Sequence, residues 1–271
     1  MEYNKAKIRQ HKYKPKFKYG VQIPRDYKDA VRIDEMNGNT LWQDAVKLEM
    51  EQIHSYSVFM DLGLDTLVPE GYKNIRVHLI FDVKHDGRHK GRLVADGHLT
   101  DIPVDSVYSG VVSLRGFRLL IFLAELNGLP IWATDVGNAY LEAHTAEKVC
   151  IQAGPEFGPL AGHRLIIDKA LYGLRTSGQR WHDRFAECMR AEGFTPCKAE
   201  PDIWMRPNGN IYIYIYIYIY IYIYEYVAVY VDDLALAVKD PKALINTLET
   251  KYNFKLKGTV ELNYHLGANF E

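Results

Sequence analysis

The chain has 271 residues, of which 48% are hydrophobic and 25% charged, with a formal net charge of -1. This composition is ordinary for a globular protein with a buried core, and it excludes a strongly basic chain of the kind that binds nucleic acid by overall charge alone. The three cysteines (Cys150, Cys188 and Cys197) are odd in number and contain no CxxC pair, which argues against a disulfide framework and a cysteine zinc site.

Basic residues are concentrated at the N-terminus. Residues 1–18 hold seven Lys or Arg residues against one acid, Glu2. Such an arm can contact phosphate groups, but it is equally typical of a solvated terminus. Residues 19–40 are polar and turn-rich, so we assign 1–40 to a basic N-terminal arm and linker. The first residues contain no apolar run, so no signal peptide is expected there.

Two helices are expected before residue 130. Leu41–Tyr56 has the spacing of an amphipathic helix, with Asn39 or Thr40 as its N-cap. Leu114–Asn127 is strongly apolar, which predicts a buried helix ending at Gly128. The face expected to be buried in the first helix consists of Leu41, Ala45, Leu48, Gln52 and Ile53.

A basic hairpin is predicted between these helices. Residues 74–82 alternate weakly and read as a strand, Asp86-Gly87 reads as a turn, and 90–98 reads as a second strand. Basic side chains on a rigid hairpin suit a triphosphate or a nucleic-acid backbone. A solvated hairpin face is an equally good interpretation. The basic residues are Arg76, Lys84, Arg88, Lys90 and Arg92.

A buried strand ending in an acid follows at Ile131–Asp135, and Val136–Leu141 turns into a helix. A carboxylate beside a turn with free backbone N–H groups is an arrangement that binds metal and phosphate together. Alternatively, Asp135 only caps the turn.

The second half of the chain alternates strands and helices. Arg164–Asp168 reads as a strand, and Ser177–Glu192 as a long helix with an apolar stripe that we assign to the core. A turn is expected at Pro207–Asn210. Pro241–Tyr252 reads as a helix, and 254–257 and 259–266 as short strands. The stripe consists of Trp181, Phe185, Cys188 and Met189.

Ile211–Tyr224 is a run of seven Ile-Tyr repeats. As one strand it would extend roughly 46 Å, far beyond ordinary strands. It is short of the ~20 residues of a membrane span and alternates in character. We interpret it as a repeat expansion within a β-hairpin loop, of the kind an AT repeat in the gene would encode, and no membrane segment is expected.

Tyr230-Val-Asp-Asp233 lies between two apolar runs, Tyr226–Val229 and Leu234–Val238. This pattern predicts a tight hairpin with two carboxylates at its tip. Adjacent carboxylates repel each other unless a divalent cation lies between them. The chemistry fits nucleotidyl transfer with two metal ions. The alternative is a surface Asp-Asp turn.

Together these motifs resemble the reverse transcriptase domain of copia-type LTR retrotransposons, over about residues 41–271. No single motif is specific, but their order and spacing are. The matching segments are Lys90–Gly97, Thr134–Leu141, Ala170–Arg175, Trp181 with Arg184-Phe185, Pro201-Asp202, Tyr230–Asp233 and Leu266-Gly267.

The resemblance implies an α+β fold. It implies a polymerase palm, which is a ferredoxin-like antiparallel sheet with helices, preceded by a fingers subdomain, with the thumb truncated or absent. The fingers-like region would span 41–130. The palm-like region would span 131–271, with the Ile-Tyr insertion at 211–224. The parent polyprotein is expected to supply the missing thumb and RNase H.

The resemblance also implies site residues. Asp135, Asp232 and Asp233 would be the catalytic residues and would hold two Mg²⁺ ions, with Mn²⁺ as an alternative. The ring of Tyr140 would lie under the deoxyribose, and Tyr230 would approach the primer end. The remaining residues expected to bind the deoxynucleoside triphosphate are Arg92, Lys84, Lys90, Asn138, Ala139, Tyr172 and Gly173.

Two departures from the family pattern leave a second interpretation open. Thr176-Ser-Gly178 stands where the family has Gln-Ser-Pro, and the Ile-Tyr run directly precedes the catalytic hairpin. The first hypothesis is an RNA-directed DNA polymerase, acting on an RNA or DNA template with a primer, in cytoplasmic particles of the parent element. The second is an inactive nucleic-acid-binding remnant of a retrotransposon polyprotein.

Overall fold

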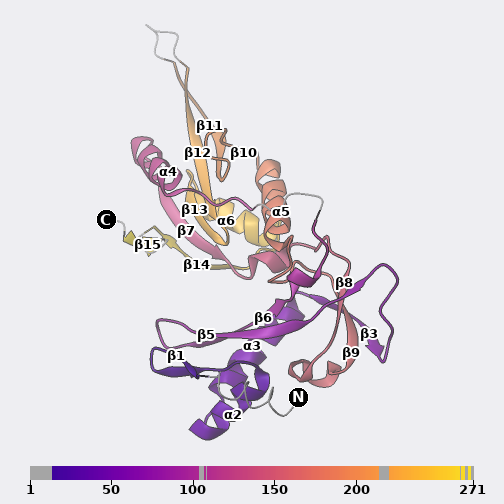
Figure 1. Cartoon of the computed structure of the whole chain (residues 1–271). Helices are drawn as coiled ribbons and strands as arrows, with labels where there is room; N and C mark the ends of the chain where they lie inside the picture. Colours follow the sequence, from indigo (N-terminus) through magenta and orange to yellow (C-terminus); the bar gives the residue numbers. More distant parts are fainter. Residues whose placement is uncertain are drawn as a thin grey trace. The chain divides into compact units, whose positions relative to one another are not determined.

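The computed structural model describes residues 14–103, 107, 109–213, 220–262, 264–265 and 268–269. The chain forms two compact units (Figure 1), each of which mixes helices and sheets. Unit 1 comprises the described residues within 1–102 and 147–175, and unit 2 those within 103–146 and 176–271. The chain therefore leaves unit 1, enters unit 2, returns, and crosses again. The ranges 1–40, 41–130 and 131–271 remain a prediction of functional subdomains.

Unit 1 holds a four-stranded sheet in the order β3-β9-β8-β4, the hairpin β5–β6 and the pair β1–β2. The expected hairpin over 74–98 is confirmed, since β5 and β6 pair antiparallel from Val77↔Ala95 to Val83↔His89. The elements are β1 Lys16–Lys18, β2 Val21–Ile23, α2 Tyr27–Asn37, α3 Leu41–Ser55, β3 Phe59–Leu64, β4 Lys73–Asn74, β5 Val77–Val83, β6 His89–Ala95, η1 Gly97–Leu99, β8 Val149–Gln152, η3 Pro155–Leu160 and β9 His163–Ile167.

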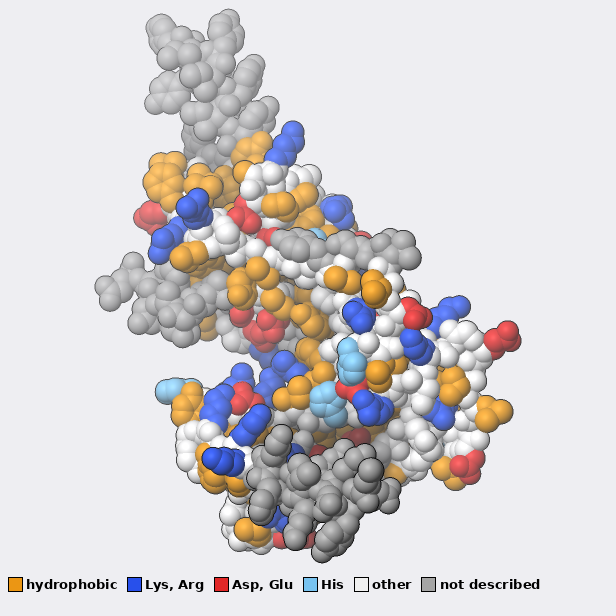
Figure 2. Space-filling model, viewed as in Figure 1, with side chains coloured by type: hydrophobic (Ala, Val, Ile, Leu, Met, Phe, Trp, Pro, Cys, Tyr) orange, Lys and Arg blue, Asp and Glu red, His pale blue; other side chains and the backbone are white. Residues whose placement is uncertain are grey.

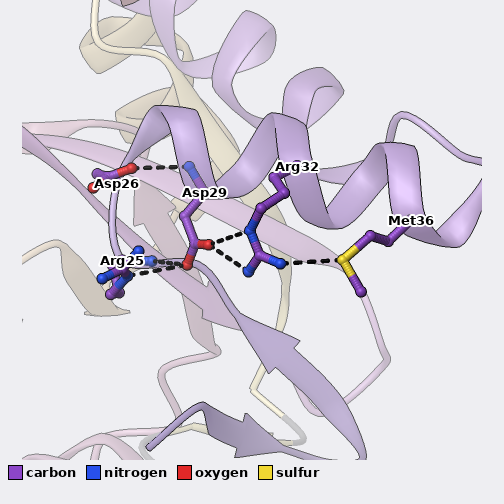
Figure 3. Close-up of polar contacts among 5 residues, drawn as sticks. All are labelled: Arg25, Asp26, Asp29, Arg32 and Met36. Atoms are coloured by element: carbon purple, nitrogen blue, oxygen red, sulfur yellow. Dashed lines mark hydrogen bonds and ion pairs between the residues drawn. The ribbon is translucent and has the colours of Figure 1, made fainter. Parts of the chain in front are cut away.

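The expectation of a turn-rich segment over 19–40 is wrong for residues 27–37, which form α2. Figure 3 shows the start of this helix: the Asp26 carboxylate accepts from the Asp29 amide at 2.9 Å. The Asp29 carboxylate accepts from the Arg32 guanidinium at 2.6 Å and from the Arg25 amide at 3.1 Å. An N-cap followed by an i,i+3 ion pair stabilises the first turn. An acid three residues after Asp26 was the sequence signal for this helix.

Helix α3 forms as expected, but only part of the expected face is buried. Ala45 and Ile53 are buried as predicted, whereas Leu41 and Leu48 are exposed. Trp42, Val46 and Glu49 complete the buried face. Thr40 is the N-cap residue, one of the two expected, but its side chain makes no capping hydrogen bond. The carboxylate of Asp34 in α2 instead accepts from the amides of Trp42 and Gln43 at 3.1 and 2.9 Å. The buried face was selected by packing against neighbouring elements. The spacing of apolar residues within one helix contains no information about those neighbours.

Glu49 is a buried carboxylate on this face. It accepts a hydrogen bond from the Leu93 amide of β6 at 3.0 Å. Burial raises the pKa of Glu49, although the Leu93 bond and the charges of Arg92 and Lys90 oppose the shift. The folded state therefore binds more protons than the unfolded state above the ordinary pKa of Glu. Linkage then requires stability to fall as pH rises through this window.

Replacing Glu49 by Gln is expected to flatten this pH dependence, because the amide oxygen still accepts from Leu93 and carries no charge. The Glu49→Gln chain should match the parent at pH 4 and be more stable at pH 8. Chemical unfolding at pH 4, 6 and 8 measures the difference. Parallel curves for both chains across this range would show that Glu49 does not titrate as a buried acid.

Unit 2 is built on a six-stranded sheet in the order β10-β11-β12-β13-β7-β14. All five strand pairings are antiparallel. The elements are α4 Leu114–Leu126, β7 Ile131–Val136, η2 Ala139–Glu142, α5 Ser177–Ala191, β10 Thr195–Pro196, β11 Ile203–Ile213, β12 Tyr220–Tyr230, β13 Asp233–Ala237, α6 Pro241–Thr250, β14 Leu256–Glu261, β15 Tyr264–His265 and β16 Ala268–Asn269.

Residues 226–229 of β12 and 234–237 of β13 are buried on both faces of the sheet, which explains their uninterrupted apolar sequences. Their side chains alternate between two cores. One core is shared with α5 and α6 and contains Val227, Val229, Leu234 and Leu236. The other is shared with α4 and contains Tyr226, Ala228, Ala235 and Ala237. The predicted stripe of the long helix, including Trp181 and Phe185, lies in the first core.

Three expectations in unit 2 are wrong in whole or in part. Pro207–Asn210 is not a turn but part of β11, which runs with β12 beyond the neighbouring strands (Figure 1). The strands expected over 254–257 and 259–266 are replaced in part by one strand, β14, with Gly258 at a φ of +61° inside it. Helix α4 is buried on one face only. Its exposed apolar residues are Leu114, Leu119, Phe122 and Leu126.

The Ile-Tyr run falls partly outside the described residues. Residues 211–213 and 220–224 belong to β11 and β12, so the described part of the run forms strand arms of a hairpin, whereas a hairpin loop was expected. Within the described parts of the chain, none of the helices has the length and apolar character needed to cross a membrane.

Candidate active site

The three predicted carboxylates meet at one end of the central strands of unit 2. Asp135 lies in β7, Asp233 is the first residue of β13, and the strand register pairs the two directly. Residues paired in this way have side chains on the same face of the sheet. Asp232 lies in the turn before Asp233, and all three residues are half-buried. Residues almost 100 positions apart are therefore brought together.

The turn that carries Asp232 is tight and strained. Tyr230 and Asp233 form the closing pair, so Val231 and Asp232 are the two loop residues. Val231 has a φ of +58°. Only the first loop residue has a positive φ, which is the pattern of a type II′ turn. Glycine is favoured there, and a β-branched residue in this conformation is strained.

Two hydrogen bonds hold the turn against this strain. The indole Nε1 of Trp181 in α5 donates to the Val231 carbonyl at 2.7 Å. The amide of Val136 donates to the Asp232 carbonyl at 2.8 Å. Since Val136 directly follows Asp135, the second bond ties one carboxylate strand to the turn that carries the other two acids.

The electrostatics of the site favour a cation. Burial, and then the negative charges of Asp232 and Asp135, raise the pKa of Asp233 to about 6. A divalent cation between the carboxylates would remove both penalties, so these residues fit a metal. In the described part of the chain, no three His, Cys, Asp or Glu side chains are already arranged as a metal cage. Metal binding therefore remains a prediction.

The segment predicted to face the triphosphate directly follows β7. Asn138 has a φ of 54°, in the left-handed region, and opens the short helix η2. Ala139 is buried, and the half-buried Tyr140 packs against the core shared with α5 and α6. These three residues therefore lie next to Asp135 on a backbone whose conformation is fixed by packing.

Lys257 is a residue near this site that the sequence interpretation missed. In β14 it is the direct strand partner of Asp135. A Cβ at Gly137 would lie 2.8 Å from Lys257 Cε, so the missing side chain at 137 leaves room for this lysine. A cation is thus held on the strand next to the carboxylates. The alternation of Lys255 and Lys257 in a predicted strand was the available signal.

The remaining predicted residues lie in unit 1, where two separate segments meet. The Arg92 guanidinium stacks on the Tyr172 ring, 4.3 Å from its centroid. The Ala95 amide donates to the Tyr172 carbonyl at 2.7 Å. Gly173 has a φ of +91°, and a Cβ there would lie 2.2 Å from the Ala95 carbonyl oxygen. Only glycine permits this approach.

Lys84 and Lys90 lie on the same hairpin as Arg92. Lys90 is the strand partner of Asp82, and the Lys84 amide donates to the Arg88 carbonyl across the hairpin turn at 2.9 Å. Figure 2 shows Lys and Arg side chains gathered over β1, β5 and β6 on the visible face of unit 1. Such a surface suits phosphate groups.

Comparison with known proteins supports one family. A family model described as reverse transcriptase (RNA-dependent DNA polymerase) matches residues 65–271. The chain is 26% identical over 268 residues to the retrovirus-related Pol polyprotein from transposon RE1 of Arabidopsis thaliana, which covers 93% of the chain and 17% of the relative.

Two further relatives are similar over shorter stretches. The retrovirus-related Pol polyprotein from transposon TNT 1-94 of Nicotiana tabacum is 26% identical over 216 residues, covering 76% of the chain and 15% of the relative. The transposon Ty1-DR1 Gag-Pol polyprotein of Saccharomyces cerevisiae is 28% identical over 197 residues, covering 69% of the chain and 10% of the relative. The chain thus spans less than a fifth of the length of these relatives.

Proposed function

Because this chain belongs to the reverse transcriptase (RNA-dependent DNA polymerase) family, in its copia-type branch, we propose that it polymerises deoxynucleotides on an RNA or DNA template. The observation that carries this proposal is the direct pairing of Asp233 with Asp135, with Asp232 in the adjoining strained turn. In this proposal unit 2 contributes the palm and the β5–β6 hairpin belongs to the fingers.

Asp135, Asp232 and Asp233 would hold two Mg²⁺ ions, or Mn²⁺ in their place. When bound, such ions supply charge neutralisation at the triphosphate and activation of the primer 3′-hydroxyl. The contribution of the chain is to hold the three carboxylates in register. The β7–β13 pairing and the two hydrogen bonds to the turn support this role.

We assign a part of the incoming deoxynucleoside triphosphate to each predicted binding residue. We assign the triphosphate to the backbone of Asn138, Ala139 and Tyr140, and the face of the sugar to the Tyr140 ring. Tyr230, which is 40% exposed beside the carboxylates, would contact the primer end. From unit 1 we assign the phosphates to Arg92, Lys84 and Lys90, and the border of the new base pair to Tyr172 and Gly173.

A second candidate function is nucleic-acid binding without catalysis. The observation that favours it is that the described residues of the Ile-Tyr run, 211–213 and 220–224, lie in β11 and β12, and β12 leads directly into the proposed catalytic turn. A slip in that hairpin by one residue would turn every side chain of the strand over.

Primer extension on an RNA template with Mg²⁺ and deoxynucleoside triphosphates tests the proposal, with the Asp233→Asn chain as the matched control. Extension by the parent that is lost in the variant is the expected result. Absence of extension in both, with template-primer binding retained in a gel-shift measurement, would favour the non-catalytic function. Equal extension by both would exclude Asp233 from catalysis.

A further inference from the structure

Arg206 and Glu225 form an ion pair across the β11–β12 hairpin. Arg206 donates from Nε and Nη2 to Glu225 Oε2 at 3.0 and 2.6 Å, and the two residues are direct strand partners. Glu225 is 5% exposed. Its other oxygen, Oε1, accepts from the Lys239 amide at 2.8 Å. Glu225 thereby connects β11, β12 and the segment after β13.

Arg206 is itself held in place from two sides. Its Nη1 donates to the Glu192 carbonyl at 2.8 Å, and its guanidinium stacks on the Phe194 ring, 4.3 Å from the centroid. A planar guanidinium with donors in a fixed geometry retains one position and orientation under such constraints. The pair borders a cavity of about 500 Å³, which is lined by charged residues and by residues of α6.

The ion pair lies on the boundary between the repeat and the catalytic hairpin. The run Ile211–Tyr224 lies wholly on one side of the pair. On the other side, Tyr230 follows Glu225 by five residues, about 16 Å at the rise of a strand. Where the repeat begins, β11 bulges, and the register passes from Pro207↔Tyr224 to Ile211↔Tyr222.

The repeat cannot specify its own register. A shift by two residues puts Ile on Ile positions and Tyr on Tyr positions, so the shifted pairing has the same pattern of faces. Among the β11–β12 pairs that the structure describes, Arg206↔Glu225 is the one of opposite charge. A shift by two would place Arg206 opposite Ile223 or Val227 and leave Glu225 buried without its cation.

We propose that Arg206 and Glu225 are a register lock. They fix the pairing of β11 with β12, so that the Tyr230–Asp233 turn keeps its position whichever register the Ile-Tyr run adopts. Both are positioning residues rather than catalytic ones. The pairing of β11 with β12 that the lock fixes is independent of the proposed function. Only its consequence for catalysis, the placement of Asp232 and Asp233, rests on the proposed function.

The test is the double variant Arg206→Met/Glu225→Met, which removes both charges without leaving one buried alone. It is made in the full chain and in a chain that lacks Ile211–Tyr224. In the shortened chain Pro207-Asn-Gly-Asn210 joins Arg206 to Glu225 as a four-residue hairpin loop, and loop length then fixes the register. Amide hydrogen exchange of residues 226–230 reports the pairing.

The double variant is expected to speed exchange of these amides at least about tenfold in the full chain and to leave it unchanged in the shortened chain. Lys251→Met removes an ion pair with Glu192 that lies outside the hairpin, and it should leave the exchange of these amides unchanged in both chains. Equal acceleration in both chains would reveal an ordinary structural role, and no acceleration in either would also overturn the lock. The exchange result does not depend on polymerase activity, so an inactive parent chain leaves the test valid.

Discussion

Replacing Asp135 by Asn is expected to lower primer extension by about a thousandfold or more, the scale on which removing one member of a catalytic unit acts. The reason is that Asp135 is the strand partner of Asp233, so the variant removes the carboxylate that lies opposite Asp233 on the sheet. The fold should persist, because Asn retains the size of the side chain. The thermal midpoint should stay equal or rise, because the variant removes a repulsion between half-buried acids.

Glu261→Gln is the matched control for this variant. Glu261 is an exposed acid on β14, in the same sheet, and its strand partner is Trp132 rather than a carboxylate. Its replacement should leave both extension and the thermal midpoint unchanged. If the Asp135→Asn chain extended primers at the rate of the parent, Asp135 would have to be removed from the proposed site.

Replacing Trp181 by Phe is expected to lower kcat by about tenfold to a hundredfold while the KM for the deoxynucleotide stays the same. The variant keeps an aromatic ring in the core but loses the N–H group that holds the Val231 carbonyl. A displacement of about 1 Å in a catalytic group is enough for such a loss. The loss of one hydrogen bond should lower stability by only about 1 kcal/mol.

Adding Val231→Gly to the Trp181→Phe chain should restore much of the lost kcat. Glycine adopts a positive φ without strain, so the turn then needs less support from α5. Phe185→Leu is the control. The ring centroids of Phe185 and Trp181 lie 5.7 Å apart, but Phe185 donates no hydrogen bond to the turn. The Phe185→Leu variant should lower the free energy of unfolding, but it should not show the loss of kcat at unchanged KM that is expected for Trp181→Phe. Failure of the glycine to rescue would mean that Trp181 acts through something other than the turn.

Much of the site was predictable because its signals are local. Two apolar runs around Tyr230–Asp233 predict a hairpin, and a buried run ending at Asp135 predicts a strand. In both cases the side chains next to each other in sequence decide the local structure. The structure confirms these strands and adds the reason for their uniform apolarity, which is burial of the sheet on both faces.

Predictions from the sequence failed for several segments whose structure its apolar pattern and turn residues did not indicate. The outer face of α4 is exposed although its sequence predicts a buried helix, and the Pro207–Asn210 segment continues a strand although its residues favour a turn. Helix α2 is stabilised by side-chain bonds at its start that hydrophobic periodicity does not register. For α4 and for Pro207–Asn210, the outcome depends on which neighbouring element is present.

The sequence by itself determined the family and most of the strands and helices, and it singled out the three carboxylates that the structure brings together, because these depend on residue type and short-range spacing. The tertiary structure alone decided that Lys257 lies opposite Asp135, that Trp181 supports the strained turn, and that Gly173 approaches the Ala95 backbone. Strand register and side-chain contact between distant segments decide these features. The apolar pattern of one strand does not specify its partner strand or their register. Both are therefore set only when the chain packs.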